Sequence, residues 1–161
     1  MIIMFKKPSH KPAQKKEISS GYTILNNRFA LQFPGTWEDK TVYTFEGPEE
    51  DGIRHNIWVT IESNVEVPDL ERYAQMNIQA TESELQGYRE LKQGPLTLAN
   101  RQPAYEHLYR WSPVENREVY QRVMYVLHNN TGYILTATFS KKTWKTLGTE
   151  VDRILSSFSV G

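Results

Sequence analysis

Apolar and polar residues alternate along several short segments, the period expected of half-buried β-strands. The first two segments, 22–25 and 28–33, flank Asn26-Asn27, and asparagine tolerates the positive φ of a tight hairpin turn. "PGTW" then interrupts the pattern at 34–37. Further strand-like segments follow at 41–46, 54–63, 88–94, 95–100, 102–111, 117–128 and 133–139. A turn is expected after the longest of them, with a glycine, Gly132, to supply positive φ.

Two other segments have the 3.6-residue period of an amphipathic helix. The first covers about 69–86, with Asp69 as the expected N-cap and Gly87 at its end. The second covers about 142–157. Strands joined by short turns pair antiparallel. The sequence therefore predicts an α+β fold, an antiparallel β-sheet of about seven strands with helices packed on it.

The segment 41–46, "TVYTFE", has apolar or hydroxyl side chains on both of its faces. Tyr43 and Phe45 point one way, whereas Val42 and Thr44 point the other. Two amphipathic helices cannot cover both faces of a long sheet completely. We therefore expect some apolar sheet surface to remain open.

Length and composition indicate a globular chain with an unusual N-terminus. The 161 residues, 39% of them hydrophobic, are enough to bury the core of one domain. Residues 1–20 contain five lysines and one glutamate, although the whole chain has a formal net charge of zero. We expect a flexible Lys-rich tail at 1–21 and a single domain at 22–161.

Several classes of site are disfavoured. Cysteine is absent, so disulfides and thiolate chemistry are excluded. No nucleophile, nucleotide-binding or metalloprotease motif occurs, and the four histidines are scattered. We predict no enzyme activity, no metal and no cofactor; the alternative of His55 meeting His107 across strands is disfavoured.

Partners and location follow from charge and from the first residues. Aromatic residues near Arg110 and Arg122 could stack single-stranded nucleic acid, but the zero net charge argues against this partner. "MIIMF" precedes the lysines, the reverse of a secretory signal, and no apolar run approaches the roughly 20 residues of a membrane span. We expect a cytoplasmic protein without membrane insertion.

Four stretches of the chain form a recognisable pattern: "FPGTWEDKTVYTFEGP", "ELQGYRELKQGPLTLANRQPAYEHLYRW", "REVYQRVMYVL" and "YILTATF", followed by a closing helix that ends in "SSF". Together they resemble the DcrB-like family of bacterial domains. The resemblance covers about residues 22–160. It implies a PsbP-like (Mog-type) α/β/α sandwich.

The cytoplasmic branch of that family includes the Eag chaperones, which bind N-terminal transmembrane helices of type VI secretion effectors. "PGTWEDKTVYTF" is similar to the start of that branch at its Pro, Trp, Asp, hydroxyl and Phe positions. The resemblance places the pair that contacts client helices at Val42 and Thr44, where Thr44 replaces an aliphatic residue. It places a polar client contact at Gln121, or at Arg122 if the register shifts by one.

The predicted client-binding residues are thus Val42, Thr44, Trp58, Gln121, Arg122 and Met124. A transmembrane helix in water exposes a large apolar area, at about 25 cal/mol per Å². Apolar sheet side chains could shield it, and Met124 would adapt to varied clients. The expected partner is a hydrophobic segment of a protein client, clasped by a homodimer.

Two alternatives remain open. Val42, Thr44 and Met124 could instead pack beneath the helices of this same chain. The chain could also be a DcrB-like or PsbP-like binding or assembly module for another partner.

Overall fold

The computed structural model describes residues 15–18, 21–25 and 30–161. The chain divides into two compact units, one comprising Met1–Lys40 with Gly161 and the other Thr41–Val160. This boundary lies about 20 residues beyond the one expected from the sequence, between 21 and 22.

The first unit contains a three-stranded antiparallel sheet in the order β1-β2-β3. Its strands are β1 (Lys15–Ile18), β2 (Gly21–Leu25) and β3 (Ala30–Pro34). The expected pairing of the first two predicted strands is confirmed, since Leu25 lies opposite Ala30. The turn predicted at 26–27 lies outside the described residues. Of the expected tail, 1–14 and 19–20 also lie outside them, and 15–18 form β1.

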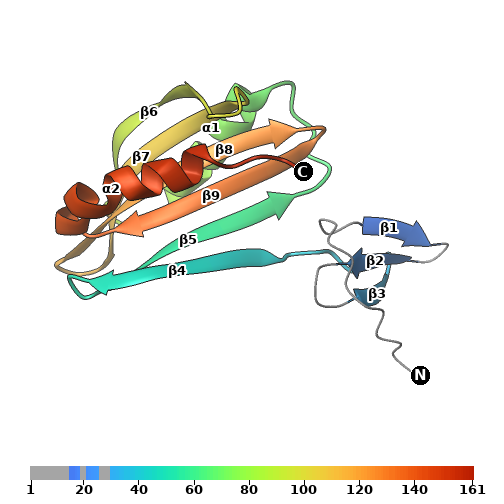
Figure 1. Ribbon diagram of the computed structural model, residues 1–161, viewed down its shortest axis with the longest axis horizontal. Helices are drawn as coiled ribbons and strands as arrows, with labels where there is room; N and C mark the ends of the chain where they lie inside the picture. The colour runs from blue at the N-terminus through green and yellow to red at the C-terminus, as the bar shows by residue number, and fades with distance from the viewer. Residues whose placement is uncertain (1–14, 19–20, 26–29) are drawn as a thin grey trace. The chain divides into compact units, whose positions relative to one another are not determined.

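The second unit is a six-stranded antiparallel sheet in the order β4-β5-β9-β8-β7-β6, with a helix on each face (Figure 1). Its strands are β4 (Val42–Glu50), β5 (Ile53–Glu62), β6 (Arg89–Thr97), β7 (Pro103–Val114), β8 (Arg117–His128) and β9 (Thr131–Phe139). The α+β class and the α/β/α sandwich are confirmed. The sheet has six strands because 88–94 and 95–100 form one strand and because the first two predicted strands belong to the other sheet. Pro95 is tolerated there because β6 is an edge strand.

Helix α1 (Leu70–Glu84) packs on β7 and β8. It begins as predicted at Asp69, whose carboxylate accepts a hydrogen bond from the backbone N–H of Arg72 at 2.8 Å. Tyr73, Ala74 and Ile78 form its buried stripe. They pack against four residues of β7 and β8: Tyr105, Tyr109, Val123 and Tyr125. We call this side of the sheet the α1 face.

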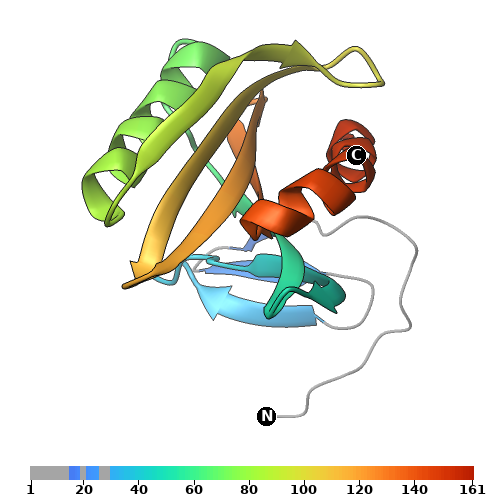
Figure 2. The same cartoon turned by 90° about the vertical axis from the view of Figure 1, so that its left-hand side faces the viewer.

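Helix α2 (Lys141–Ser156) lies on the opposite side, so that the sheet is sandwiched between the two helices (Figure 2). Ser140 and Thr143 form a capping box at its N-terminus. Val151 and Leu155 then pack onto β8 and β9. We call this side the α2 face.

Two turns differ from the sequence prediction. Residues 47–50, expected in a loop, continue β4 past a bulge between Glu46 and Glu49. The β8–β9 turn places Asn129 and Asn130 at φ of 49° and 57°, whereas Gly132 is a buried strand residue. Asparagine therefore supplies the positive φ that was expected of glycine in this turn.

Candidate functional site: an open strip on the α1 face

Cross-strand pairing sorts the α1 face into three rows, because directly opposed residues share a face. The first row is Val42, Thr60, Ile134, Tyr125 and Tyr105. The second row is Thr44, Trp58, Thr136, Val123 and His107. The third row is Glu46, Asn56, Thr138, Gln121 and Tyr109. Helix α1 covers mainly the β7 and β8 ends of these rows.

The β4 and β5 ends of the rows remain uncovered. Val42 is 50% exposed and Trp58 is 45% exposed, and Thr44 is exposed between them. The expectation that the two helices leave apolar sheet surface open is confirmed. We call this surface, together with the half-buried Thr136 and Thr138 of the neighbouring β9, the open strip; it consists of Val42, Thr44, Trp58, Thr60, Thr136 and Thr138.

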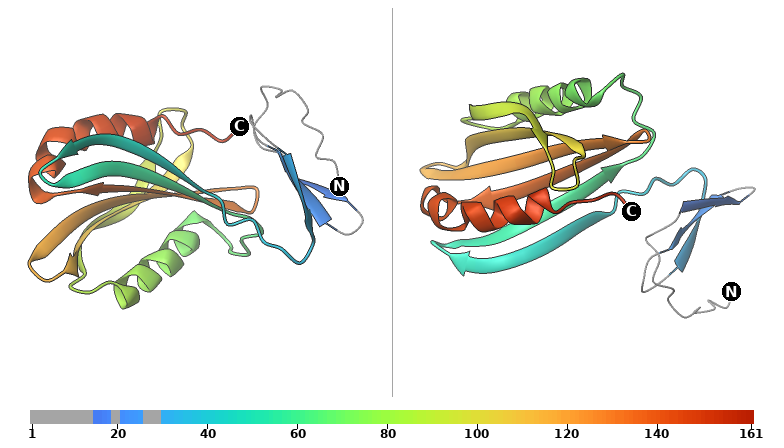
Figure 3. Two further views of the ribbon diagram at one scale, coloured as in Figure 1. Left: turned by 90° about the horizontal axis from the view of Figure 1, so that it is seen from below. Right: turned by 45° about the horizontal axis from the view of Figure 1, so that its top comes forward.

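Strand β4 is exposed on its α2 face as well. All nine of its residues are exposed, and Phe45, on the side opposite Val42, is 59% exposed. Figure 3 (right) shows β4 at the edge of the sheet, to one side of α2. The segment 42–45 has apolar or hydroxyl side chains on both faces of β4. Within this unit, both of these faces are uncovered.

The open strip ends at one side where α1 begins. The hydroxyl of Tyr73 donates a hydrogen bond of 2.6 Å to Oε2 of Glu62, at the end of β5. Burial raises the pKa of Tyr73 well above its usual value, and the Glu62 carboxylate raises it further. The phenol therefore stays protonated and keeps donating this bond.

At the other side, Gln121 forms the buried floor of the strip. Its Oε1 accepts hydrogen bonds from the Tyr109 hydroxyl at 2.9 Å and from Nε1 of Trp111 at 2.7 Å. Its Nε2 donates to Oγ1 of Thr138 at 3.1 Å. Gln121, rather than Arg122, is thus the residue of β8 that belongs to the α1 face.

Met124 and Arg122 belong to the α2 face, so the prediction that Met124 is exposed beside Val42 and Thr44 is wrong. Met124 pairs with Glu106 and Leu135, is 2% exposed, and lies in the core beneath α2. Arg122 forms ion pairs with Glu106 and with Asp152 of α2. Both side chains are occupied within the chain.

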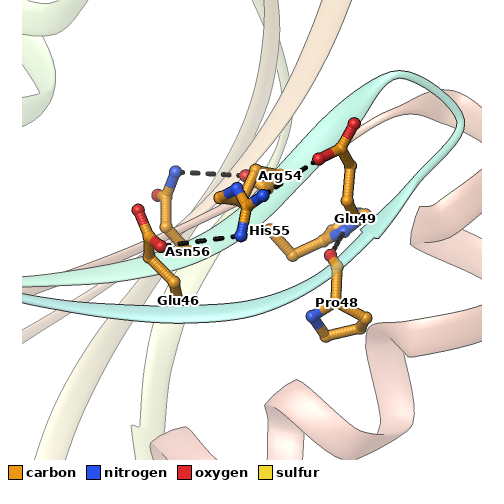
Figure 4. Close-up of polar contacts among 6 residues, drawn as sticks. All are labelled: Glu46, Pro48, Glu49, Arg54, His55 and Asn56. Atoms are coloured by element: carbon orange, nitrogen blue, oxygen red, sulfur yellow. Dashed lines mark hydrogen bonds and ion pairs between the residues drawn. The ribbon is translucent and has the colours of Figure 1, made fainter.

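The β4–β5 hairpin is held to the sandwich through His55. Its Nδ1 donates to the carbonyl of Pro48 at 2.8 Å, and its Nε2 lies 2.7 Å from Oγ1 of Thr143 in the α2 capping box. Arg54 pairs with Glu46 and Glu49 on the exposed side of the same hairpin (Figure 4). The hairpin is thus fixed at its tip while the rest of β4 stays uncovered.

On the α1 face, where it lies opposite Val123, His107 is completely buried. Its Nε2 is hydrogen-bonded to the Tyr88 hydroxyl at 2.9 Å, and its Nδ1 has no partner among the described residues. Burial lowers the pKa of His107 to about 4 and raises that of Tyr88 to about 12. Both groups are therefore neutral at neutral pH.

The alternative sites lack the required geometry. His55 lies on the α2 face and His107 on the α1 face, so they do not meet. Within residues 15–18, 21–25 and 30–161, no cluster of His, Asp or Glu is suited to a metal. Tyr105, Tyr109 and Tyr125 are buried against α1, which leaves these rings no free face for bases. Among the described helices, none combines the length and apolar character needed to cross a bilayer.

Comparison with known proteins identifies the family and the fold. Residues 30–157 match the model of the family described as DcrB. No curated protein matches the sequence significantly. A solved structure of a protein of unknown function from Pseudomonas aeruginosa, PA94, superposes with a TM-score of 0.71 at 13% identity, covering 94% of this chain and 99% of that one. This similarity supports a shared fold.

Two further structures are more distant. The Ran-binding protein Mog1p of Saccharomyces cerevisiae has a TM-score of 0.47 and 12% identity, covering 86% of this chain and 82% of its own. PsbP of the cyanobacterium Synechocystis (CyanoP) has a TM-score of 0.49 and 11% identity, covering 93% of each chain.

Proposed function

This chain belongs to the DcrB family, and on that premise we propose that it is a non-catalytic chaperone or adaptor that shields a hydrophobic helix of a protein client. The open strip is the surface we assign to the client. We propose further that the client is a secreted effector, of the type VI class that the resemblance to Eag chaperones implies, and that binding takes place in the cytoplasm.

The composition of the open strip supports this proposal. Val42 and Trp58 supply exposed apolar surface, which water would otherwise have to solvate. Between them lie threonines, whose methyl groups are apolar and whose hydroxyls can form hydrogen bonds. Hydroxyls of this kind join helices to one another inside membranes. A surface of this type suits a helix that is mostly apolar with an occasional polar residue.

We also propose that the chain acts as a homodimer. Strand β4 is an edge of the six-stranded sheet, and an uncovered edge is a template for pairing with another strand. Pro48 and the bulge after Glu46 protect the hairpin end, but 42–46 has neither device. Pairing or packing of two copies near β4 would bring two open strips to one client. Sedimentation velocity should give twice the mass of one chain.

The proposal is tested by co-expression. The client is an apolar helix of about 20 residues fused to a soluble carrier protein. The full chain should keep this fusion in the soluble fraction and co-purify with it. Val42→Asp should abolish co-purification, since a bound apolar helix would strand the carboxylate.

The matched control is Ile154→Asp, on α2 and exposed to nearly the same extent as Val42, at 49% against 50%. It should bind the fusion as the wild type does. If the fusion stays insoluble with the wild type, or if Val42→Asp binds it normally, the proposal is wrong and the chain serves another partner.

A further inference from the structure

The side-chain amide of Gln121 has only one possible orientation. The indole Nε1 of Trp111 carries a hydrogen and can only donate, so the Gln121 atom 2.7 Å away must be its oxygen. The hydroxyl of Tyr109 donates to the same oxygen. Both lone pairs of Oε1 are then used, and Nε2 necessarily points at Thr138.

This orientation determines the role of the Thr138 hydroxyl. Because Nε2 of Gln121 can only donate, Oγ1 of Thr138 accepts the hydrogen bond of 3.1 Å between them. The hydroxyl hydrogen of Thr138 is therefore left for another acceptor. Among residues 15–18, 21–25 and 30–161, the Thr138 hydroxyl takes part in no other hydrogen bond.

Thr138 lies where a bound helix could reach it. It is half-buried at the β9 position of the third row, between Gln121 and Asn56. Oδ1 of the neighbouring Asn56 is buried without a hydrogen-bond partner, so the Thr138 hydroxyl does not donate to it. The third row is thus a polar border to the apolar part of the open strip. Trp111 and Tyr109 donate hydrogen bonds to Gln121, and Gln121 in turn donates one to Thr138.

We propose that Thr138 is a specificity-determining hydrogen-bond donor of the open strip, and that it binds an acceptor oxygen on the client helix. The ligand class is a hydroxyl or carboxamide side chain, Ser, Thr, Asn or Gln, within an otherwise apolar helix. Gln121 is a positioning residue that turns the Thr138 hydroxyl outward from the network, and it does not itself contact the client. This inference depends on the proposed function and refines it.

The second row provides a matched control. Thr136 lies on the same strand and the same face, two residues from Thr138, and is also half-buried. It has no hydrogen bond to Gln121. Replacing Thr136 by valine removes one hydroxyl from the open strip, as Thr138→Val does. It leaves the hydrogen bonds among Trp111, Tyr109, Gln121 and Thr138 intact.

The experiment is a double-mutant cycle with the full chain. The probes are fluorescent Leu/Ala helices of about 20 residues fused to a soluble carrier, with one central Thr or, in the paired probe, the isosteric Val. We expect Thr138→Val to weaken binding of the Thr probe by about five- to tenfold, the size of one net hydrogen bond, and to leave the Val probe within about twofold. Thr138→Ser should restore the preference for Thr. Thr136→Val removes a hydroxyl of the same strip and is expected to weaken binding of both probes alike, leaving the ratio of their affinities unchanged.

The outcomes separate the two proposals. Two results would refute the role of Thr138 while the client site stands, provided that the wild type binds both probes. In one, Thr138→Val lowers the affinity for the Thr and Val probes by the same factor. In the other, Thr136→Val abolishes the preference for the Thr probe as fully as Thr138→Val does. If the wild type binds neither probe, the proposed function is refuted and this inference with it. Urea unfolding of each variant shows whether the fold is intact.

Discussion

The Tyr73 hydroxyl on α1 donates to the Glu62 carboxylate at the end of β5, and its ring lies directly over the backbone of Gly132 on β9. One aromatic side chain thus joins the helix to two strands at the border of the open strip. A methyl group at position 132 would overlap the Tyr73 ring and hydroxyl. Glycine is required at position 132 because the Tyr73 side chain approaches the backbone there closely. The φ angle of Gly132 is not one that demands glycine.

Gly132→Ala should therefore destabilise the fold. Either Tyr73 leaves Glu62 or the two elements move apart, and we expect a loss of roughly 2–4 kcal/mol in the free energy of unfolding. Urea unfolding measures it. Gly94→Ala, in β6 with open space around the added methyl, is the control and should change stability by less than about 1 kcal/mol. Equal effects of the two substitutions would contradict the packing argument.

Protonation of His107 should make the fold sensitive to acid. The pKa is about 4 in the folded chain and about 6.5 in the unfolded chain, so the unfolded state binds more protons between these values. Stability should fall by up to roughly 3 kcal/mol as the pH drops from 6.5 to 4. His107 faces the Tyr88 hydroxyl and the Tyr109 ring, neither of which offers a negative charge to compensate.

Urea unfolding across this pH range tests the prediction. His107→Gln lacks the titrating ring and should give a visibly flatter profile, even if its stability at pH 7 is lower. Parallel profiles for the wild type and His107→Gln would show that another group controls the acid response.

Thr143→Val should loosen the β4–β5 hairpin. The substitution preserves shape but leaves two buried groups without their partner, Nε2 of His55 and the backbone N–H of Ser140. We expect a loss of roughly 2–4 kcal/mol and faster hydrogen exchange at 42–54. Thr146→Val, an exposed threonine of the same helix, should have little effect. Unchanged exchange in the hairpin would mean that His55 does not anchor it.

Gly148→Ala should stabilise the chain. Gly148 lies inside α2, where glycine costs conformational entropy, and an added methyl would meet no atom within 4 Å. The expected gain is about 0.5–1 kcal/mol, read from the urea midpoint. A loss of stability would indicate that the helix sits closer to the sheet than described.

The sequence was sufficient to predict structural features that depend only on the local period of apolar residues within one segment. The two-residue alternation placed Val42 and Thr44 together on one face of β4, and the helical period placed both helices within a few residues. Asp69 as N-cap followed from its own side-chain chemistry.

Positions that depend on the register between strands were not predictable in this way. Whether Met124 shares a face with Val42 is decided by three successive pairings, through β5, β9 and β8, and alternation within β8 cannot supply them. The same pairings bring Gln121 beside Thr138 and Trp111, a network that no single segment indicates. Gly132 looked like a turn residue because the ring that requires it, Tyr73, is 59 residues away in sequence.

Site-specific photo-cross-linking tests the central claim most directly. A benzophenone amino acid replaces Trp58 in the open strip or, as the control, Ile154, which is similarly exposed on α2. Each full-length variant is co-expressed with the apolar-helix fusion and irradiated. Cross-links from position 58 to the helix, with none from position 154, are predicted; cross-links from position 154 alone, or equal yields from both, would contradict the claim that the open strip binds the client.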